Sequence, residues 1–314
     1  MRIGSLFSGA GGLDMAVEAV FGGRTVWHSE IDKAASKVLA YRWPDVPNLG
    51  SITEIDWASV EPVDVLCGGW PCQPFSLAGK RKGIDDERAL WPYVAGAIRI
   101  LRPRYVVLEN VSAVLTAGEL ERVTTDLAAS GYDIRWSCVR ASEVGAPHRR
   151  ERIFIVAHAS GYGWDEGRPE SAGIVGGFDA AVSGDEPGVA LLPTPNASDG
   201  SGGGQHPDKR EGHSRQLIDY VLAPSQWGKY EPAIRRWESL TRPAPAPTEP
   251  NKNGNPRLSA LFSEWLMGWP DGWVTDPDIG ISRNDQLRII GNGVVSLQCE
   301  YALRYLLSVA EVSR

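Results

Sequence analysis

Cys72 lies in the segment of this sequence whose residue types and spacing most directly suggest chemistry. It stands in the string GGWPCQPFS (68–76), directly after the apolar run VDVLC (63–67). Prolines on both sides restrict the backbone, so the thiol is expected at the carboxyl end of a strand instead of inside a core. Its thiolate is then a candidate nucleophile for covalent catalysis. Cys67, inside the apolar run, is expected to be buried and inert.

Glu109 ends the next apolar run, YVVLENV (105–111), so its carboxylate is expected at the same sheet edge as Cys72. A buried carboxyl group beside a ring nitrogen can stay protonated and donate a hydrogen bond to it. Arg150 and Arg152 lie in PHRRERIFIVA (147–157) and share a face if that segment is a strand. From there they can grip a carbonyl oxygen or a phosphate.

The glycine-rich string FSGAGGLD (7–14) is suited to a nucleoside. Glycines let backbone amides approach a ligand, and Glu30, at the end of the next apolar run, can take two ribose hydroxyls. A dinucleotide fingerprint needs glycine where Asp14 stands; a carboxylate repels a pyrophosphate and suits the cationic amino acid part of S-adenosylmethionine. A second string, IIGNGVV (289–295), is expected to open the final helix and close over the cofactor. Each string alone could also be a tight turn or an ordinary helix start.

Alternating strand and helix patterns must position these residues. Apolar runs at 3–7, 25–30, 63–69, 105–111, 134–141 and 152–159 predict strands, and segments 13–21, 32–41, 90–101 and 119–129 have helical spacing. This order predicts βαβ units around a largely parallel sheet. The amino-acid composition then changes. Residues 160–204 are rich in Gly, Asp, Ser and Pro, and the composition of residues 241–256 predicts a Pro-rich linker or irregular loop. Regular patterns return at 258–269 and 294–307, and Trp265, Trp269 and Trp273 are expected in the core.

Composition limits the class of protein. A chain of 314 residues that is 42% hydrophobic can bury one large core with a smaller lobe, or two ordinary domains. It shows neither a signal peptide nor an apolar run of membrane length, so a cytosolic protein is expected. The four cysteines form no CxxC pair and lie far from the histidines, which disfavours a metal site and a disulfide framework.

Charge leaves nucleic acid open as a partner. The net charge of -7 disfavours a surface coated with basic groups, but it is compatible with a local basic cleft. Basic residues cluster within 80–104 and 140–152, where they can face phosphate or pair with neighbouring acidic side chains.

Taken together and in order, FSGAGGLD, GGWPCQPFS, ENV, PHRRERIFIVA and IIGNGVV resemble the motifs of the DNA cytosine-5 methyltransferases. The resemblance covers residues 1 to about 158 and 257 to 314. It implies an α/β fold with a doubly wound, mostly parallel sheet of the S-adenosylmethionine-dependent methyltransferase type and a smaller loop-rich target-recognition lobe. It divides the chain into a catalytic and cofactor-binding domain (1–158), the target-recognition lobe (159–262) and a C-terminal segment that returns to the catalytic domain (263–314).

The resemblance also implies roles for the matched residues. Cys72 is the nucleophile that adds to C6 of a cytosine flipped out of duplex DNA, Glu109 is the partner of its N3, and Asn110 supports the loop before Cys72. Arg150 and Arg152 anchor cytosine O2 and the active-site loop. No metal is implied. The implied S-adenosylmethionine contacts are Phe7, Gly9, Gly11, Asp14, Glu30, Ile31, Ser51, Ile52, Asn292 and Val294. The implied DNA contacts, in a mobile loop that closes over the duplex, are Gln73, Ser76, Lys80, Arg81, Lys82 and Arg88.

Three positions depart from the family pattern. Ser51 stands where an acidic residue usually precedes Ile52 and touches the adenine amino group, so Ser51 must substitute or that contact is weaker. His148 takes the first place of the usual Q-x-R-x-R element, and Trp70 stands where proline is common. No departure removes a catalytic group.

Three other functions stay open. An RNA cytosine-5 methyltransferase acting on tRNA shares nearly all these motifs, but the large middle lobe favours DNA because a duplex site needs a reader in the groove. A nicotinamide oxidoreductase is disfavoured by Asp14. A DNA-binding module that has lost catalysis is disfavoured because no catalytic residue is missing. We expect residues 191–200 and 206–215 to read bases. A monomer is expected, in a bacterial cell or phage-infected host, with a cognate restriction endonuclease as a candidate partner.

We expect Cys72→Ser to abolish methyl transfer while cofactor and DNA binding persist, because a hydroxyl is a far weaker nucleophile than a thiolate. Incorporation of labelled methyl groups, measured beside binding titrations, checks this. Near-normal methylation by the variant would refute the nucleophile assignment.

Overall fold

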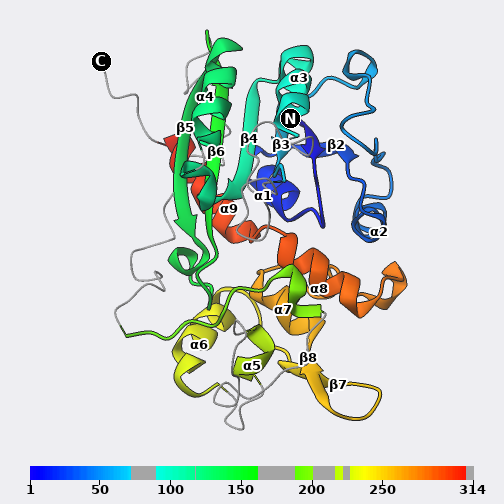
Figure 1. Cartoon of the computed structure of the whole chain (residues 1–314), viewed down its shortest axis with the longest axis vertical. Helices are drawn as coiled ribbons and strands as arrows, with labels where there is room; N and C mark the ends of the chain where they lie inside the picture. The colour runs from blue at the N-terminus through cyan, green and yellow to red at the C-terminus, as the bar shows by residue number, and fades with distance from the viewer. Residues whose placement is uncertain (72–89, 117, 162–187, 201–215, 222–226, 309–314) are drawn as a thin grey trace.

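A six-stranded mixed sheet forms the centre of the larger lobe in this computed structural model, which describes residues 1–71, 90–116, 118–161, 188–200, 216–221 and 227–308 (Figure 1). The strand order is β2-β1-β3-β4-β6-β5. The first four of these strands are parallel, and β6 runs antiparallel to both β4 and β5. The mostly parallel α/β sheet expected from the sequence is confirmed. The strands are β1 (Arg2–Leu6), β2 (Arg24–Ser29), β3 (Val65–Gly68), β4 (Tyr105–Val111), β5 (Tyr132–Arg140) and β6 (Glu151–Ala159).

Helices cover both faces of this sheet, which explains why its central strands read as continuous apolar runs. Tyr105 and Val107 of β4 belong to the core shared with α1 and α9, whereas Val106 and Leu108 belong to the core shared with α3 and α4. The helices of the larger lobe, together with α2 at its side, are α1 (Gly12–Phe21), α2 (Lys33–Arg42), α3 (Trp91–Leu101), α4 (Glu119–Ala129) and α9 (Ser296–Ser308). The chain therefore returns to the first sheet through its last described helix.

The smaller lobe lies below the carboxyl edge of the parallel strands in Figure 1 and has its own core of stacked aromatic rings. Trp227 stacks on Phe262 with ring centroids 5.6 Å apart, and Phe262 stacks on Trp265 at 5.5 Å. Its elements are α5 (Leu217–Val221), α6 (Glu231–Leu240), the hairpin strands β7 (Thr248–Pro250) and β8 (Pro256–Leu258), α7 (Ala260–Leu266) and α8 (Arg283–Asn292). Short 3-10 turns are η1 (Trp57–Ser59), η4 (Ser112–Leu115), η5 (Ala141–Val144), η8 (Ala197–Gly200), η10 (Gly228–Tyr230) and η11 (Pro277–Ile279).

The tail differs from its sequence prediction in two places. The string IIGNGVV does not open the final helix: residues 289–292 end α8, and Gly293 leaves the helical conformation with ψ of -179° before α9 begins. The irregular loop predicted over 241–256 is wrong in its second half, because Thr248–Pro250 pairs with Pro256–Leu258 in a hairpin. Trp265 and Trp269 are buried and Trp273 packs against the same core, as expected.

No helix among the described residues is both long enough and apolar enough to span a lipid bilayer.

We expect Gly4→Ala to lower the free energy of unfolding by about 1–3 kcal/mol, the usual cost of overpacking a core. A Cβ on Gly4, in β1, would lie 2.2 Å from Cζ2 of Trp27. That ring cannot move easily, because its Nε1 donates to the Glu61 carbonyl at 3.0 Å and the residue is 2% exposed.

Gly96→Ala is the matched control, since an added Cβ in α3 meets no atom within 4 Å. This variant should be neutral or gain about 1 kcal/mol from helix propensity. Denaturant unfolding of both variants checks the pair, and equal effects would contradict the packing argument.

Candidate active site

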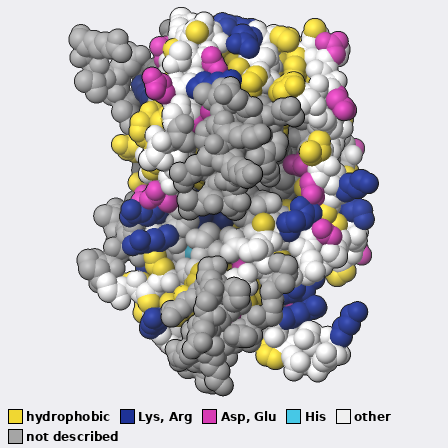
Figure 2. All heavy atoms as spheres, viewed as in Figure 1, with side chains coloured by type: hydrophobic (Ala, Val, Ile, Leu, Met, Phe, Trp, Pro, Cys, Tyr) yellow, Lys and Arg dark blue, Asp and Glu magenta, His cyan; other side chains and the backbone are white. Residues whose placement is uncertain are grey.

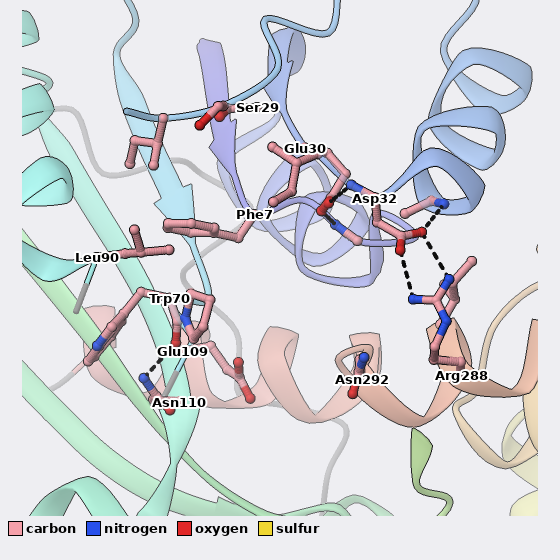
Figure 3. A pocket seen from close by; sticks show the side chains of 18 of the residues that line it. Phe7, Ser29, Glu30, Asp32, Trp70, Leu90, Glu109, Asn110, Arg288 and Asn292 are labelled. Atoms are coloured by element: carbon pink, nitrogen blue, oxygen red, sulfur yellow. Dashed lines mark hydrogen bonds and ion pairs between the residues drawn. The ribbon is translucent and has the colours of Figure 1, made fainter. Parts of the chain in front are cut away.

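A cavity of about 610 Å³ lies at the carboxyl edge of the parallel strands, where the larger lobe meets α8 (Figure 3). Carboxyl ends of neighbouring parallel strands meet at one edge, which is where α/β sheets bind ligands. The walls come from the segments that follow β1, β2 and β3, from the end of β4, from the start of β6, and from α8. Of the residues predicted for the site, the cavity is lined by Phe7, Gly9, Glu30, Ile31, Ser51, Ile52, Glu109, Asn110, Arg150, Arg152 and Asn292.

Glu30 defines one end of the cavity. Its Oε2 accepts a hydrogen bond from the Gly9 amide at 2.8 Å and its Oε1 accepts one from the Asp32 amide at 2.7 Å. Asn48 holds the backbone of Glu30 on both sides, accepting from its N–H and donating to its carbonyl. The carboxylate is thus oriented in advance by main-chain donors, and it still lines the cavity.

Apolar side chains stand beside this carboxylate. Ile31 is 73% exposed although it is a large aliphatic residue, and Ile52 and Phe7 line the same wall. An exposed aliphatic side chain next to an oriented carboxylate suits a ligand with an aromatic base and a hydroxylated sugar. Ser51 lies here too, with its hydroxyl 2.7 Å from that of Thr53.

Glu109 and Arg152 form the opposite end. Glu109 is 9% exposed at the end of β4, and its Oε1 lies 3.0 Å from Nε of Arg152. Burial raises the pKa of Glu109, although the Arg152 and Arg150 guanidinium groups act in the opposite direction. A Cβ on Gly69 would lie 2.9 Å from the Glu109 carboxylate, so a glycine after β3 gives this side chain its space.

Asn110 and Pro71 mark where the chain leaves β3 beside Glu109. The Asn110 side chain is buried and its Nδ2 donates to the Trp70 carbonyl at 3.0 Å. Pro71 lines the cavity, and Cys72 follows it directly in the sequence. Outside the described residues lie Cys72 itself, the predicted DNA contacts Gln73, Ser76, Lys80, Arg81, Lys82 and Arg88, and the predicted base-reading segment 206–215.

Arg150 lines the cavity, but both of its terminal nitrogens donate to backbone carbonyls of the protein. It is 4% exposed, has a φ of +32°, and donates to the carbonyls of Pro195 and Gly291 at 3.1 Å each and also to that of Gly293. The side chain therefore fastens the start of β6 to the smaller lobe and to the turn after α8. Of the two predicted arginines, Arg152 is the one whose side chain lies beside Glu109 in the cavity.

Gly11, Asp14 and Val294 are not brought to the cavity. Asp14 is fully buried in the first turn of α1, with its Oδ1 3.4 Å from Nε2 of His28, so the expectation that its charge meets a ligand is corrected. Gly11 gives room to the Trp43 ring, which an added Cβ would approach to 2.4 Å. The Val294 carbonyl accepts from Nε1 of Trp269.

Two charged residues that line the cavity, Asp32 and Arg288, were not among those predicted from the sequence. Asp32 lines the wall beside Glu30, and Arg288 of α8 reaches it from the other side. Asp32 carried a usable signal, because an aspartate between a strand and a helical pattern is a typical N-cap. Arg288 carried none, since nothing in the sequence linked it to a residue 256 positions away.

Within the part of the chain that the structure describes, no group of three or more His, Cys, Asp or Glu side chains is placed to hold a metal ion.

Comparison with known proteins points to one family. The family model described as C-5 cytosine-specific DNA methylase matches residues 1–183. Type II methyltransferase M.HgiCII of Herpetosiphon aurantiacus is 36% identical over 162 residues, 49% of this chain and 36% of that protein. Type II methyltransferase M.HhaI of Haemophilus parahaemolyticus is 33% identical over 160 residues, 50% of this chain and 48% of that protein. The match thus spans less than half the length of either relative.

Solved structures are similar over nearly the whole chain. The Dnmt2 methyltransferase of S. pombe superposes with a TM-score of 0.63 at 16% identity, covering 98% of both chains. The methyltransferase EhMeth of Entamoeba histolytica gives a TM-score of 0.59 at 16% identity, covering 98% of this chain and 97% of that one. At such identities the similarity shows a shared fold.

We expect Glu109→Gln to gain stability relative to the wild type as the pH rises. Because burial raises the folded-state pKa of Glu109 above its ordinary value of 4.5, the folded protein binds that proton more tightly than the unfolded chain does. Wild-type stability therefore falls as the pH rises from the ordinary value through the raised one, whereas glutamine does not titrate.

Urea unfolding of both proteins across this pH range checks the sign. The substitution also changes the contact with Arg152. This change adds a constant to the difference in unfolding free energy between the two proteins, and the constant does not depend on the Glu109 proton. A stability difference that stays flat, or that moves toward the wild type with rising pH, would contradict the raised pKa.

Proposed function

This chain belongs to the C-5 cytosine-specific DNA methylase family, and from that premise we propose that it methylates carbon 5 of cytosine in duplex DNA with S-adenosylmethionine as donor. The observation that carries the proposal is that one cavity has two chemically different ends. One end offers the oriented Glu30 carboxylate beside apolar side chains, and the other offers Glu109 and Arg152. A nucleoside-bearing donor and a pyrimidine can meet in one such space.

The residues around Glu30 fit S-adenosylmethionine. Glu30 would accept hydrogen bonds from the ribose hydroxyls, and Ile31 and Ile52 would pack against the adenine ring. Asn292, at the end of α8, would close the wall opposite them. When bound, the donor supplies an electrophilic methyl group on a sulfonium centre. Asp14 has no part in this proposal, because its side chain is fully buried and does not line the cavity.

Glu109 and Arg152 would hold the cytosine. A carboxyl group with a raised pKa can keep a proton for N3, and the neighbouring guanidinium can donate to O2. Both would neutralise charge that develops on the ring, and losing one such oriented donor typically costs about 2.7–4 kcal/mol. Because C6 is shielded within a duplex, the base must first leave the stack, at a cost of roughly a few kcal/mol.

Cys72 is proposed as the nucleophile. Carbon 5 of cytosine is a weak nucleophile, so addition of the thiolate to C6 is needed to turn the ring into an enamine. Carbon 5 then takes the methyl group, its proton leaves to a base, and elimination of the thiolate restores the ring. The position of Cys72 in the sequence, directly after the cavity residue Pro71, supports this assignment.

Duplex DNA is the proposed substrate. Figure 2 shows Lys and Arg side chains on both flanks of the level where the two lobes meet, so an acidic chain still presents local positive charge there. Cations on both flanks suit a phosphate backbone. We propose that the target-recognition lobe (159–262) reads the target and that the protein acts as a monomer. We also propose that a restriction endonuclease shares its site, as the names of its type II relatives suggest.

Glu109→Gln should keep cofactor and DNA affinity but lower the single-turnover rate of methyl transfer about a hundredfold or more, since an amide cannot supply the proton of a carboxyl group. Glu300→Gln on α9, in a salt bridge with Arg304, is the matched control and should transfer at the wild-type rate.

The same assay with tRNA in place of duplex DNA separates the two substrate classes. Methylation of duplex DNA at cytosine carbon 5, detected by bisulfite sequencing, is the expected result. Labelling of tRNA alone would overturn the choice of DNA, and unchanged rates in Glu109→Gln would show that N3 needs no such partner.

A further inference from the structure

Arg288 and Asp32 form an ion pair across the cavity wall, between two segments far apart in the chain. Nη1 of Arg288 lies 2.8 Å from Oδ2 of Asp32, and Nη2 lies 3.2 Å from Oδ1, so the guanidinium grips both carboxylate oxygens (Figure 3). Asp32 is the N-cap of α2 and Arg288 belongs to α8. Both side chains line the cavity. The pair therefore joins the first βα segment to the helix that closes the opposite wall.

Asp32 connects this pair to the carboxylate of Glu30. The Asp32 amide donates to Oε1 of Glu30 at 2.7 Å, while Oε2 of Glu30 accepts from Gly9. On α8, Asn292 stands one turn after Arg288, and both face the cavity. A movement of α8 away from α2 would thus shift Asn292 and release one of the restraints on Glu30.

Loss of the pair should leave the fold intact. The segment η8 packs closely on α8. A Cβ on Gly291 would lie only 2.1 Å from the carbonyl carbon of Asn196, the residue directly before η8. Arg150 ties the end of α8 to β6 through the Gly291 carbonyl. The helix is thus held to the smaller lobe and to β6 by contacts that do not involve Asp32, so Arg288 controls mainly its link to α2.

We infer that the Arg288–Asp32 ion pair is a positioning clamp that fixes the spacing between the Glu30 wall and the α8 wall and so sets affinity for the adenosyl ligand. The inference rests on the proposed function for the identity of that ligand. In this view Arg288 acts through Asp32 and α8, and touches no ligand itself. The hydrogen bonds from Arg288 fit this role: although burial opposes them, they help to lower the pKa of Asp32 and keep it ionised.

A double-mutant cycle tests the clamp. Arg288→Gln removes the cation, and Asp32→Asn removes the anion while its side-chain oxygen can still cap α2 by accepting from Ala34 and Ala35. Arg304→Gln is the matched control, since Arg304 pairs with Glu300 at 2.7 Å on α9, outside the cavity. Calorimetry with S-adenosylhomocysteine and with S-adenosylmethionine measures affinity without requiring turnover.

Each single variant should weaken binding of both ligands about fivefold, the factor that corresponds to the ~1 kcal/mol upper value for a partly exposed pair. The double variant should bind no more weakly than the weaker single variant. KM for the donor should rise by the same factor as the dissociation constant, while kcat stays near that of the wild type. Arg288→Lys should recover part of the lost affinity. Arg304→Gln should bind as the wild type does, and all variants should keep the wild-type unfolding midpoint within a few degrees.

Three outcomes would overturn the clamp. Unchanged affinity in both single variants would do so, as would additive losses in the double variant, which indicate two independent contacts. Weakened binding in Arg288→Gln with wild-type binding in Asp32→Asn would show that Arg288 acts without Asp32, through its contact with Asp285 or by touching the ligand. If the wild type binds neither S-adenosyl ligand, the proposed function itself is refuted. If the wild type and the variants bind these ligands equally well, the clamp alone is refuted.

Discussion

The contact between the Glu109 carboxyl group and the Arg152 guanidinium is the interaction on which the site depends. Glu109 lies near the end of β4, and Arg152 lies near the start of β6, the strand beside it. The two meet only because β6 runs antiparallel to β4 and pairs Arg152 with Val111. A parallel β6 would carry its first residues to the far edge of the sheet. One reversed strand thus places a cation next to a carboxyl group that burial tends to neutralise, and the pair can present both a proton and a positive charge to one ligand edge.

The rest of the cavity brings a second kind of chemistry to this pair. Four parallel strands deliver their carboxyl ends to one edge, and the segments after β1 and β2 build the oriented carboxylate of Glu30 with main-chain donors. The wall opposite Glu30 comes from α8, close to the other end of the chain. Arg150 and the clamp hold that wall from two sides, so the distance between donor and acceptor sites is set by contacts among distant segments. Since transfer between two bound groups requires near-contact geometry, this spacing is itself part of the proposed chemistry.

Much of this arrangement can be predicted from local sequence patterns, but the remainder cannot. Strands buried on both faces give continuous apolar runs, so β4 was located from its sequence alone, and motif residues at strand ends such as Glu30 and Glu109 line one cavity. The direction of β6 was not accessible, because an apolar run reads the same in a parallel and an antiparallel strand. The burial of Asp14 against His28 depends on how α1 packs on β2, and the partner of Arg288 depends on a contact across 256 positions. Helix α8 was missed since glycines at 291 and 293 suggested a helix start where one helix ends.

The central claim is that the thiol after Pro71 attacks a cytosine held by Glu109 and Arg152, and a trapping experiment tests it most directly. A DNA duplex that carries 5-fluorocytosine in place of the target cytosine permits addition and methyl transfer but blocks elimination, because fluorine cannot leave as the proton does. Incubation with S-adenosylmethionine, followed by digestion and mass spectrometry, should give a stable protein–DNA adduct on the peptide that contains Cys72. No adduct under conditions where ordinary duplex DNA is methylated, or an adduct mapped to Cys67, Cys138 or Cys299, would contradict the account.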